Sequence, residues 1–246
     1  MFISAYLISF YSIIHEFDRI IIQFIIDHFS HSREMFYDIF FLSGDHLFKG
    51  GVMIAILWYT WFIHDDIEKD RKRMYLVATI LAAIFGMVIS RSLTAMLPFH
   101  QRPLFDLSFH YFDFPMEKYG FDKLSSFPSD HAVLFISLAT GLFLVSRKIG
   151  MIAIAYVLLV ILFPRVYLGY HWPSDIVAGG IIGAGITTFF IKSEWIINLI
   201  SKFTLPVLLK RPALFYAILF LVTYQIADMF DASRAFAGFV KHIVQK

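Results

Sequence analysis

Long apolar stretches alternate with short polar ones along most of this chain. A helix of about 20 apolar residues crosses a bilayer, because it rises about 1.5 Å per residue and the hydrocarbon core is about 30 Å thick. We therefore predict about six transmembrane helices. They fall at residues 47–63, 74–97, 131–145, 149–163, 172–191 and 213–230.

Two further regions have an amphipathic character. Residues 1–43 are interrupted by charges from Glu16 onward, which favours helices at the membrane interface, with a single span as the alternative. The first residues lack the basic region and the small-residue cleavage site of a signal peptide. Residues 194–209 are also predicted to form an interfacial helix. The expected fold is all-α, a polytopic membrane helical bundle that forms a single domain over residues 1–246.

The composition agrees with a membrane protein. Hydrophobic residues make up 59% of the chain and charged residues only 16%, whereas an average soluble domain is about half apolar and a quarter charged. The formal net charge of +2 is too small to indicate a nucleic-acid partner. Because the chain has no cysteine, it has no disulfide framework, no thiolate nucleophile and no cysteine-based metal site.

Basic residues in the short polar segments predict the orientation. Most of them fall on one side of the predicted membrane: Lys69, Arg71, Lys72, Arg73, Arg147, Lys148, Lys192, Lys202, Lys210 and Arg211. The positive-inside rule makes this side cytoplasmic. In a bacterial cell we expect the protein in the cytoplasmic (inner) membrane, with the opposite side facing the periplasm or the cell exterior.

Three polar clusters fall at predicted helix ends on that opposite side. They are FHQRP with Arg102, SFPSDHA with Ser129, Asp130 and His131, and PRVYLGYHWPSD with Arg165, His171 and Asp175. The planar guanidinium group suits phosphate oxygens, which makes Arg102 and Arg165 candidate phosphate ligands. The start of a helix at Ser129 would add free backbone N–H groups. We interpret the three clusters as one phosphate site.

The two histidines supply the remaining groups that hydrolysis requires. His171 could attack phosphorus through one ring nitrogen, while Asp175, one turn further on, accepts a hydrogen bond from the other. His131 would protonate the leaving oxygen. We expect no cofactor and no metal, because the neighbouring arginines would repel a divalent cation. A site at the membrane edge favours a lipid phosphate or diphosphate as the substrate.

These motifs resemble the three-part signature of the type-2 phosphatidic acid phosphatase superfamily. The matching residues are RP at 102–103, PSDH at 128–131 and R-x5-H-x3-D at 165–175, and the resemblance covers roughly residues 47–191. It implies a helical core and a phosphohistidine intermediate, with His171 as the nucleophile and His131 as the acid. It also implies that Arg102 and Arg165 hold the phosphate. Undecaprenyl diphosphate is the first expected substrate, with phosphatidylglycerol phosphate and phosphatidic acid as rivals.

Two residues of the chain, Ala95 and Pro164, depart from that signature. Ala95 replaces the usual lysine of the first motif, and Pro164 replaces a serine before Arg165. Our hypothesis is that Arg91, one helical turn before Ala95, reaches into the site in place of the lysine. Asp130 stands where many members have glycine, which resembles bacterial diphosphate phosphatases of the bacitracin-resistance type.

Two other functions remain as alternatives. A lipid phosphotransferase would use the same histidine but pass the phosphate to a lipid acceptor. A non-enzymatic anion transporter or binding protein would use only the arginines. We interpret the remaining histidines of the polar segments, His46, His100 and His110, as interfacial loop residues.

Overall fold

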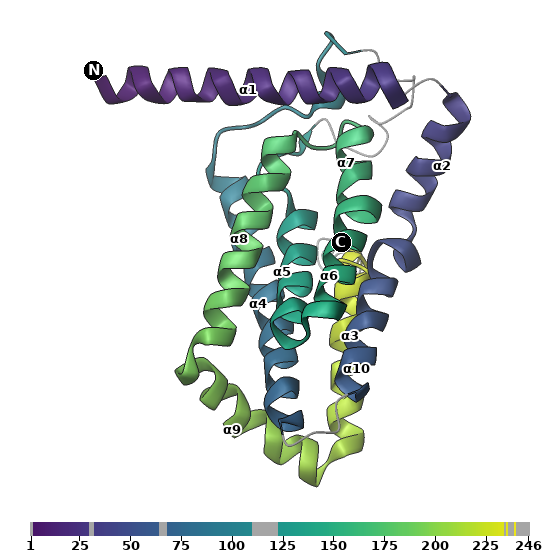
Figure 1. The fold of residues 1–246 in the computed structure, drawn as a ribbon, viewed down its shortest axis with the longest axis vertical. Helices are drawn as coiled ribbons and strands as arrows, with labels where there is room; N and C mark the ends of the chain where they lie inside the picture. Colours follow the sequence, from purple (N-terminus) through teal and green to yellow (C-terminus); the bar gives the residue numbers. More distant parts are fainter. Residues whose placement is uncertain are drawn as a thin grey trace.

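The computed structural model describes residues 2–29, 32–63, 68–109, 123–233, 235 and 239, with side chains from residue 13 onward. The described residues form helices and no strands, as Figure 1 shows. The helices are α1 (Phe2–Phe29), α2 (Arg33–Gly44), η1 (Leu47–Gly51), α3 (Val52–Ile63), α4 (Lys69–Met96), η2 (Pro103–Phe105), α5 (Asp130–Val145), α6 (Arg147–Tyr156), η5 (Val157–Leu162), α7 (Phe163–Tyr167), α8 (Pro173–Lys192), α9 (Glu194–Lys210) and α10 (Pro212–Ala227). The predicted all-α class is confirmed.

Several helices are long and apolar enough to cross a membrane. These are α4, α8 and the stretch Arg147–Tyr167, in which α6, η5 and α7 follow one another. The pair Arg33–Gly44 and Leu47–Ile63 passes the same test together but bends by 61°. The helices α5 and α10 are apolar but shorter. Every predicted span is therefore helical, and the chain is an integral membrane protein.

Helix α5 is the centre of the bundle and packs against α4, α6 and α8. Its side chains are buried on nearly all faces, including Leu134, Phe135, Leu138 and Leu142. A helix that is apolar all round is expected in such a central position. The residues at its beginning are thereby fixed relative to the neighbouring helices.

Close contact between α5 and α8 depends on two glycines of α8. A Cβ atom at Gly179 would lie 2.5 Å from the carbonyl oxygen of Ser129, and one at Gly183 would collide with the carbonyl oxygen of Val133. At Gly185 a Cβ would meet nothing within 4 Å, and at Gly180 it would make only an ordinary contact. Small residues thus bring the two backbones together at Gly179 and Gly183.

Helix α1 lies crosswise over one end of the bundle (Figure 1). Its inner face buries Asp18, Ile22 and Ile25, whereas Phe17 and Phe24 on another face are exposed. This spacing is that of an amphipathic helix. The structure therefore has two separate helices, α1 and α2, in residues 1–43, and α1 is not among the candidate spans.

Polar contacts hold α1 against the bundle. The carboxylate of Asp18 accepts hydrogen bonds from the backbone N–H and the hydroxyl group of Ser174, at 2.9 and 2.5 Å. Burial raises the pKa of Asp18, and the hydrogen bonds from Ser174 act in the opposite direction. Arg19 donates to Asp106 at 2.9 Å and to Ser108 at 2.7 Å. The end of the bundle where α8 begins is thus covered by α1.

Candidate active site

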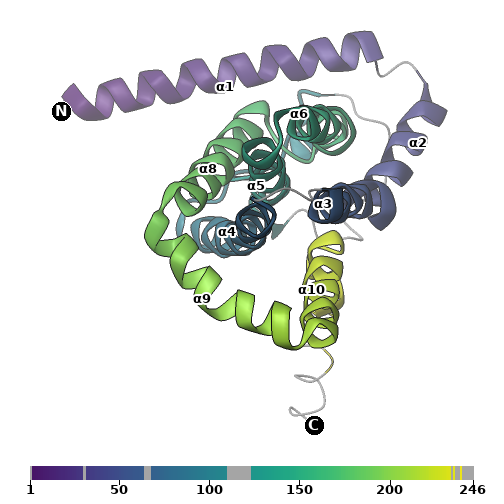
Figure 2. The ribbon, with the colours of Figure 1, turned by 60° about the horizontal axis from the view of Figure 1, so that its bottom comes forward.

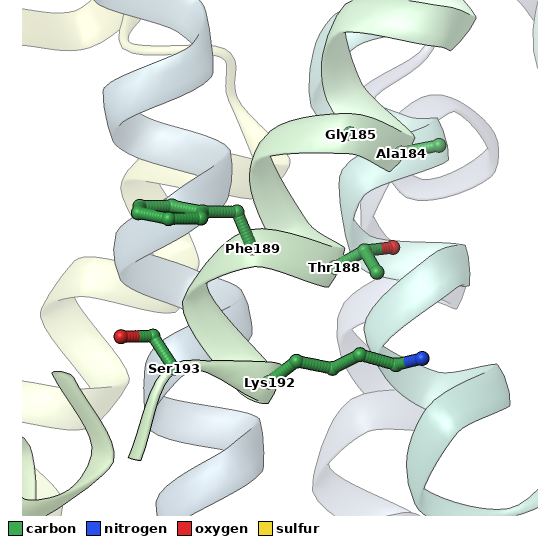
Figure 3. A pocket seen from close by; sticks show the side chains of 6 residues that line it. All are labelled: Ala184, Gly185, Thr188, Phe189, Lys192 and Ser193. Atoms are coloured by element: carbon green, nitrogen blue, oxygen red, sulfur yellow. The ribbon is translucent and has the colours of Figure 1, made fainter. Parts of the chain in front are cut away.

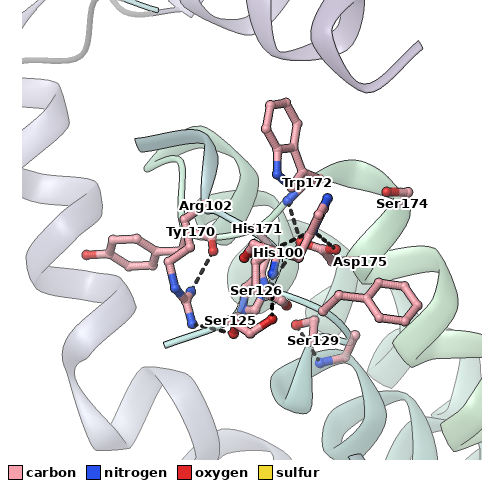
Figure 4. Close-up of polar contacts among 12 residues, drawn as sticks. His100, Arg102, Ser125, Ser126, Ser129, Tyr170, His171, Trp172, Ser174 and Asp175 are labelled. Atoms are coloured by element: carbon pink, nitrogen blue, oxygen red, sulfur yellow. Dashed lines mark hydrogen bonds and ion pairs between the residues drawn. The ribbon is translucent and has the colours of Figure 1, made fainter. Parts of the chain in front are cut away.

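The three polar clusters meet at one end of the bundle (Figure 4). Asp130 and His131 begin α5, Arg165 lies in α7, and His171 and Asp175 flank the start of α8. Arg102 directly precedes η2. The sequence separates these groups by as many as 73 residues, but the helix ends bring them together.

His171 is buried, with 4% of its surface exposed. Its Nδ1 atom lies 2.8 Å from the backbone carbonyl oxygen of Ser126. A carbonyl oxygen only accepts hydrogen bonds, so Nδ1 must carry a proton. The lone pair of the neutral imidazole is then on Nε2.

Asp175 does not orient His171 in the expected way. Its Oδ2 atom lies 3.7 Å from Nδ1 of His171, which is too long for a hydrogen bond. The same oxygen accepts the backbone N–H of Trp172 at 2.8 Å and so caps the start of α8. The acceptor for His171 is the Ser126 carbonyl, because the loop before α5 comes closer to the ring than the carboxylate does.

His131 has a carboxylate partner of its own. Its Nδ1 atom lies 2.9 Å from Oδ1 of Asp130, and Oδ2 of Asp130 pairs with Arg91 at 2.5 Å. Arg91 therefore reaches the beginning of α5 from α4. One ring nitrogen of His131, one of His171 and a carboxylate oxygen of Asp130 all lie within 4.8 Å of one another.

The same three groups, Asp130, His131 and His171, could also hold a metal ion by their spacing. Both oxygens of Asp130 are already engaged, one by Arg91 and the other by His131. A cation bound here would have to displace the arginine or tolerate its charge. The donor set therefore fits a metal ion poorly.

Arg165 is buried between Ser43 and Tyr170. Its Nη2 atom donates to the carbonyl oxygen of Ser43 at 2.7 Å, and its guanidinium lies 5.6 Å from the centre of the Tyr170 ring. Its Nε atom is buried without a hydrogen-bond partner among the described residues. An unsatisfied buried donor is costly, and an anionic ligand would satisfy it.

Arg102 brings a positive charge to the site and also donates hydrogen bonds to the backbone of neighbouring segments. Its guanidinium donates to the carbonyl oxygens of Tyr170 at 2.6 Å, Leu124 at 3.2 Å and Ser125 at 3.4 Å. Burial lowers its pKa, and the carboxylates of Asp130 and Asp175 oppose this shift. Arg102 therefore joins the segment before α5 to the segment before α8.

Ser129 caps α5. Its hydroxyl oxygen accepts the backbone N–H of Ala132 at 3.4 Å, and its own N–H donates to the carbonyl oxygen of Asp175 at 3.2 Å. Ser129 is fully buried. The predicted helix start is confirmed, and its hydroxyl group serves the cap.

The sequence analysis missed His100 and Ser126. Nδ1 of His100 lies 2.8 Å from the Ser126 hydroxyl and 3.4 Å from Oδ1 of Asp175 (Figure 4). The position of His100 two residues before Arg102 was the only signal for it. Ser126 contributes a backbone carbonyl, which no side-chain pattern reveals. His46 contacts Asp228 instead, and His110 lies outside the described residues.

A surface groove lies elsewhere, towards the other end of α8. Ala184, Gly185, Thr188, Phe189, Lys192 and Ser193 line it (Figure 3). These residues begin about 14 Å along the helix from Asp175, at about 1.5 Å per residue. The groove is open and holds none of the three polar clusters, so it plays no part in the site.

Fold and site together define an integral membrane protein with a helical bundle, in which three histidines and three arginines gather at one end. The chain belongs to the PAP2 superfamily, whose match extends over residues 73–198, just over half of the sequence. The match includes every candidate site residue, from Arg91 to Asp175.

Individual relatives match over shorter parts. An undecaprenyl-diphosphatase of Sulfolobus acidocaldarius is 35% identical over 69 residues, which are 28% of this chain and 34% of that protein. The bacitracin transport permease protein BcrC of Bacillus licheniformis is 37% identical over 59 residues, 24% of this chain and 29% of that protein. YbjG of Escherichia coli is 26% identical over 149 residues, 58% of this chain and 65% of that protein. The chain thus spans less than two thirds of each of these relatives, and no solved structure matches it significantly.

Proposed function

We propose that this protein is a phosphatase that hydrolyses a lipid phosphate or diphosphate, with undecaprenyl diphosphate as the first candidate. The observation that carries the proposal is the contact of 2.8 Å between Nδ1 of His171 and the Ser126 carbonyl oxygen. It leaves Nε2 as a free nucleophile in a site that also contains a second histidine and buried arginines. Membership in the PAP2 superfamily and the name of the Sulfolobus relative support the reaction class.

In the proposed first step, Nε2 of His171 attacks phosphorus and forms an N–P bond. The bond from phosphorus to the leaving oxygen breaks, and His131 gives its proton to that oxygen. The Ser126 carbonyl oxygen stabilises the positive charge that develops on the His171 ring, because it accepts a hydrogen bond from the Nδ1–H group. Asp130 holds His131 through Nδ1, which leaves Nε2 of that ring to carry the transferred proton.

In the second step, water attacks the phosphohistidine. His131, now without its proton, accepts one from the water, and the N–P bond breaks to release inorganic phosphate. Arg165 would donate Nε to a phosphate oxygen, and Arg102 and Arg91 would supply positive charge. Ser129 would contribute through the beginning of α5, whose N–H groups and dipole favour an anion. The site would face the periplasm or the cell exterior, and no cofactor or metal takes part.

The test is phosphate release by the purified protein in detergent. Undecaprenyl diphosphate, phosphatidylglycerol phosphate and phosphatidic acid would be compared, each with and without a chelator. We expect release without any added lipid acceptor and no effect of the chelator. Loss of activity with the chelator would contradict the metal-free mechanism, and release that requires a lipid acceptor would indicate a phosphotransferase.

The variant His171→Ala separates a phosphatase from an anion-binding protein. We expect turnover to fall by roughly a thousandfold or more, because the proposed nucleophile is removed. His28→Ala is the matched control, since His28 is exposed on α1 and lies outside the site. A transporter or binding protein would keep its function in both variants.

A further inference from the structure

His100 lies beside Ser126, whose backbone carbonyl oxygen contacts Nδ1 of His171, the proposed nucleophile. Three contacts join it to Ser126: the Ser126 N–H donates to the His100 carbonyl oxygen at 2.9 Å, the Ser126 hydroxyl approaches the same oxygen at 3.2 Å, and Nδ1 of His100 lies 2.8 Å from that hydroxyl. Ser126 is fully buried, so these contacts are shielded from water. The Ser126 peptide is thus held from both its backbone and its side chain.

Two neighbours favour a proton on Nδ1 of His100. The Ser126 hydroxyl donates a hydrogen bond to the His100 carbonyl oxygen at 3.2 Å, and its oxygen then accepts one from Nδ1. Oδ1 of Asp175 is a buried carboxylate oxygen that has no hydrogen-bond partner among the described residues; it lies 3.4 Å from the same Nδ1 and only accepts. We therefore assign the ring proton of His100 to Nδ1.

We propose that His100 is a positioning residue for His171, acting through the Ser126 peptide and the Asp175 carboxylate. The His100 N–H fixes Ser126 so that the Ser126 carbonyl oxygen accepts a hydrogen bond from Nδ1–H of His171, and it opposes the negative charge of Asp175. Without that N–H, Asp175 would compete with the Ser126 carbonyl for the His171 ring, which is already within 3.7 Å of it. The expected effect of His100 on the reaction rate rests on the proposed phosphatase function.

Two substitutions separate positioning from a purely structural role. His100→Phe keeps an aromatic ring next to Trp172 and Phe127 but removes the N–H, whereas His100→Asn places an amide N–H near the position of Nδ1. We expect His100→Phe to lower kcat by roughly ten- to a hundredfold, as loss of a group that orients a catalytic residue does. KM should stay within about threefold, because His100 does not hold the phosphate, and His100→Asn should regain most of kcat.

The kinetic result has clear controls. His28→Phe makes the same substitution at an exposed position of α1 and should leave kcat unchanged. Thermal unfolding in detergent checks that each variant folds. His100→Ala removes the N–H with a smaller side chain if the phenylalanine is not accommodated. Unchanged kcat in a folded variant without the N–H, or a His100→Asn variant as slow as His100→Phe, would overturn the proposal.

A measurement without substrate keeps this inference separate from the proposed function. Nitrogen NMR of the protein labelled with ¹⁵N-histidine reports which ring nitrogen of His171 carries the proton, and His171→Gln identifies the signals. We expect the Nδ1-protonated signals in the wild type and displaced signals in His100→Phe. If no lipid phosphate is hydrolysed by the wild type, the proposed function fails, and unchanged His171 signals in His100→Phe would refute the positioning role.

Discussion

Asp130 brings a negative charge into a site proposed for an anion, and Arg91 compensates for it. The two side chains come from different helices, α4 and α5, and their ion pair of 2.5 Å is half exposed on the arginine side. The sequence suggested that Arg91 replaces the lysine that is absent at Ala95. The pair with Asp130 is compatible with that role and adds a second one, because Arg91 also holds the carboxylate that contacts His131.

We predict that Arg91→Ala lowers phosphatase activity by roughly ten- to a hundredfold, which corresponds to the loss of about 1.5–3 kcal/mol from a charge-assisted hydrogen bond. Arg91→Lys should retain part of the activity. The measurement is phosphate release at saturating and at limiting substrate. Arg33→Ala, which removes an exposed arginine of α2, is the control, and unchanged turnover in Arg91→Ala would rule out a role for Arg91.

A double variant with Arg91→Ala and Asp130→Gly distinguishes the two roles of Arg91, which are to bind phosphate and to hold Asp130. If the arginine acts only through Asp130, its loss should cost no further activity once Asp130 is gone, and the double variant should match Asp130→Gly alone. If the arginine binds phosphate itself, the double variant should be slower than Asp130→Gly. Non-additivity of the first kind is the expected sign of a direct pair.

Among the elements, the contact between α5 and α8 decides where the proposed catalytic groups lie. His131 is at the beginning of α5, and His171 and Asp175 flank the beginning of α8. The two backbones approach each other at Gly179 and Gly183, and the Ser137 hydroxyl adds a hydrogen bond to the Gly183 carbonyl at 3.2 Å. Any change that separates these helices should therefore move the two histidines apart.

We predict that Gly183→Ala lowers the unfolding temperature and the activity together. The added methyl group would meet the Val133 carbonyl, and overpacking of this kind costs about 1–3 kcal/mol. Gly185→Ala is the matched control on the same helix, since its methyl group would enter open space. Thermal unfolding in detergent measures the difference, and equal unfolding temperatures for the two variants would contradict the proposed packing.

Helix α1 is the element whose position the sequence left open. Its charges predicted an interfacial helix, and the structure fixes it over the site end through Asp18 and Arg19. The ring of His15 also lies 5.1 Å from that of Trp172, next to His171. These contacts place α1 against the segment that carries His171, the proposed nucleophile, and they could not be inferred from the hydropathy of α1.

At the scale of the whole molecule, the candidate site lies at one end of the bundle and a group of basic residues at the other. The candidate site gathers where α5 and α8 begin, and Figure 2, turned to bring the opposite end forward, shows α9 there beside α4 and α10. Basic residues of the sequence, including Lys69, Lys148 and Lys192, fall at the ends of helices away from the site. The positive-inside rule then predicts an extracytoplasmic site.

We predict that single cysteines will report this orientation, because the natural chain has none. Leu107→Cys lies near the site and replaces a side chain that is 96% exposed, whereas Lys148→Cys lies in the first turn of α6. A maleimide that cannot cross membranes should label Leu107→Cys in intact spheroplasts. It should label Lys148→Cys only after permeabilisation, and the reverse pattern would contradict the orientation.

The sequence by itself determined the class of protein and the chemical groups of its site. Hydropathy reveals membrane helices because each stretch must satisfy its backbone within itself in lipid, which is a local requirement. The spacing of Arg165, His171 and Asp175 relative to a helix start is equally local. The all-helical fold and the family were therefore accessible from the pattern of residues alone.

Only the tertiary structure decided how those groups are oriented. The acceptor for His171 is a backbone carbonyl 45 residues away, and Asp18 meets Ser174 across 156 residues. A backbone carbonyl has the same chemistry at every residue, so its direction depends on how the chain is folded. For the same reason His100 gave no distinct signal until the fold placed it between Ser126 and Asp175.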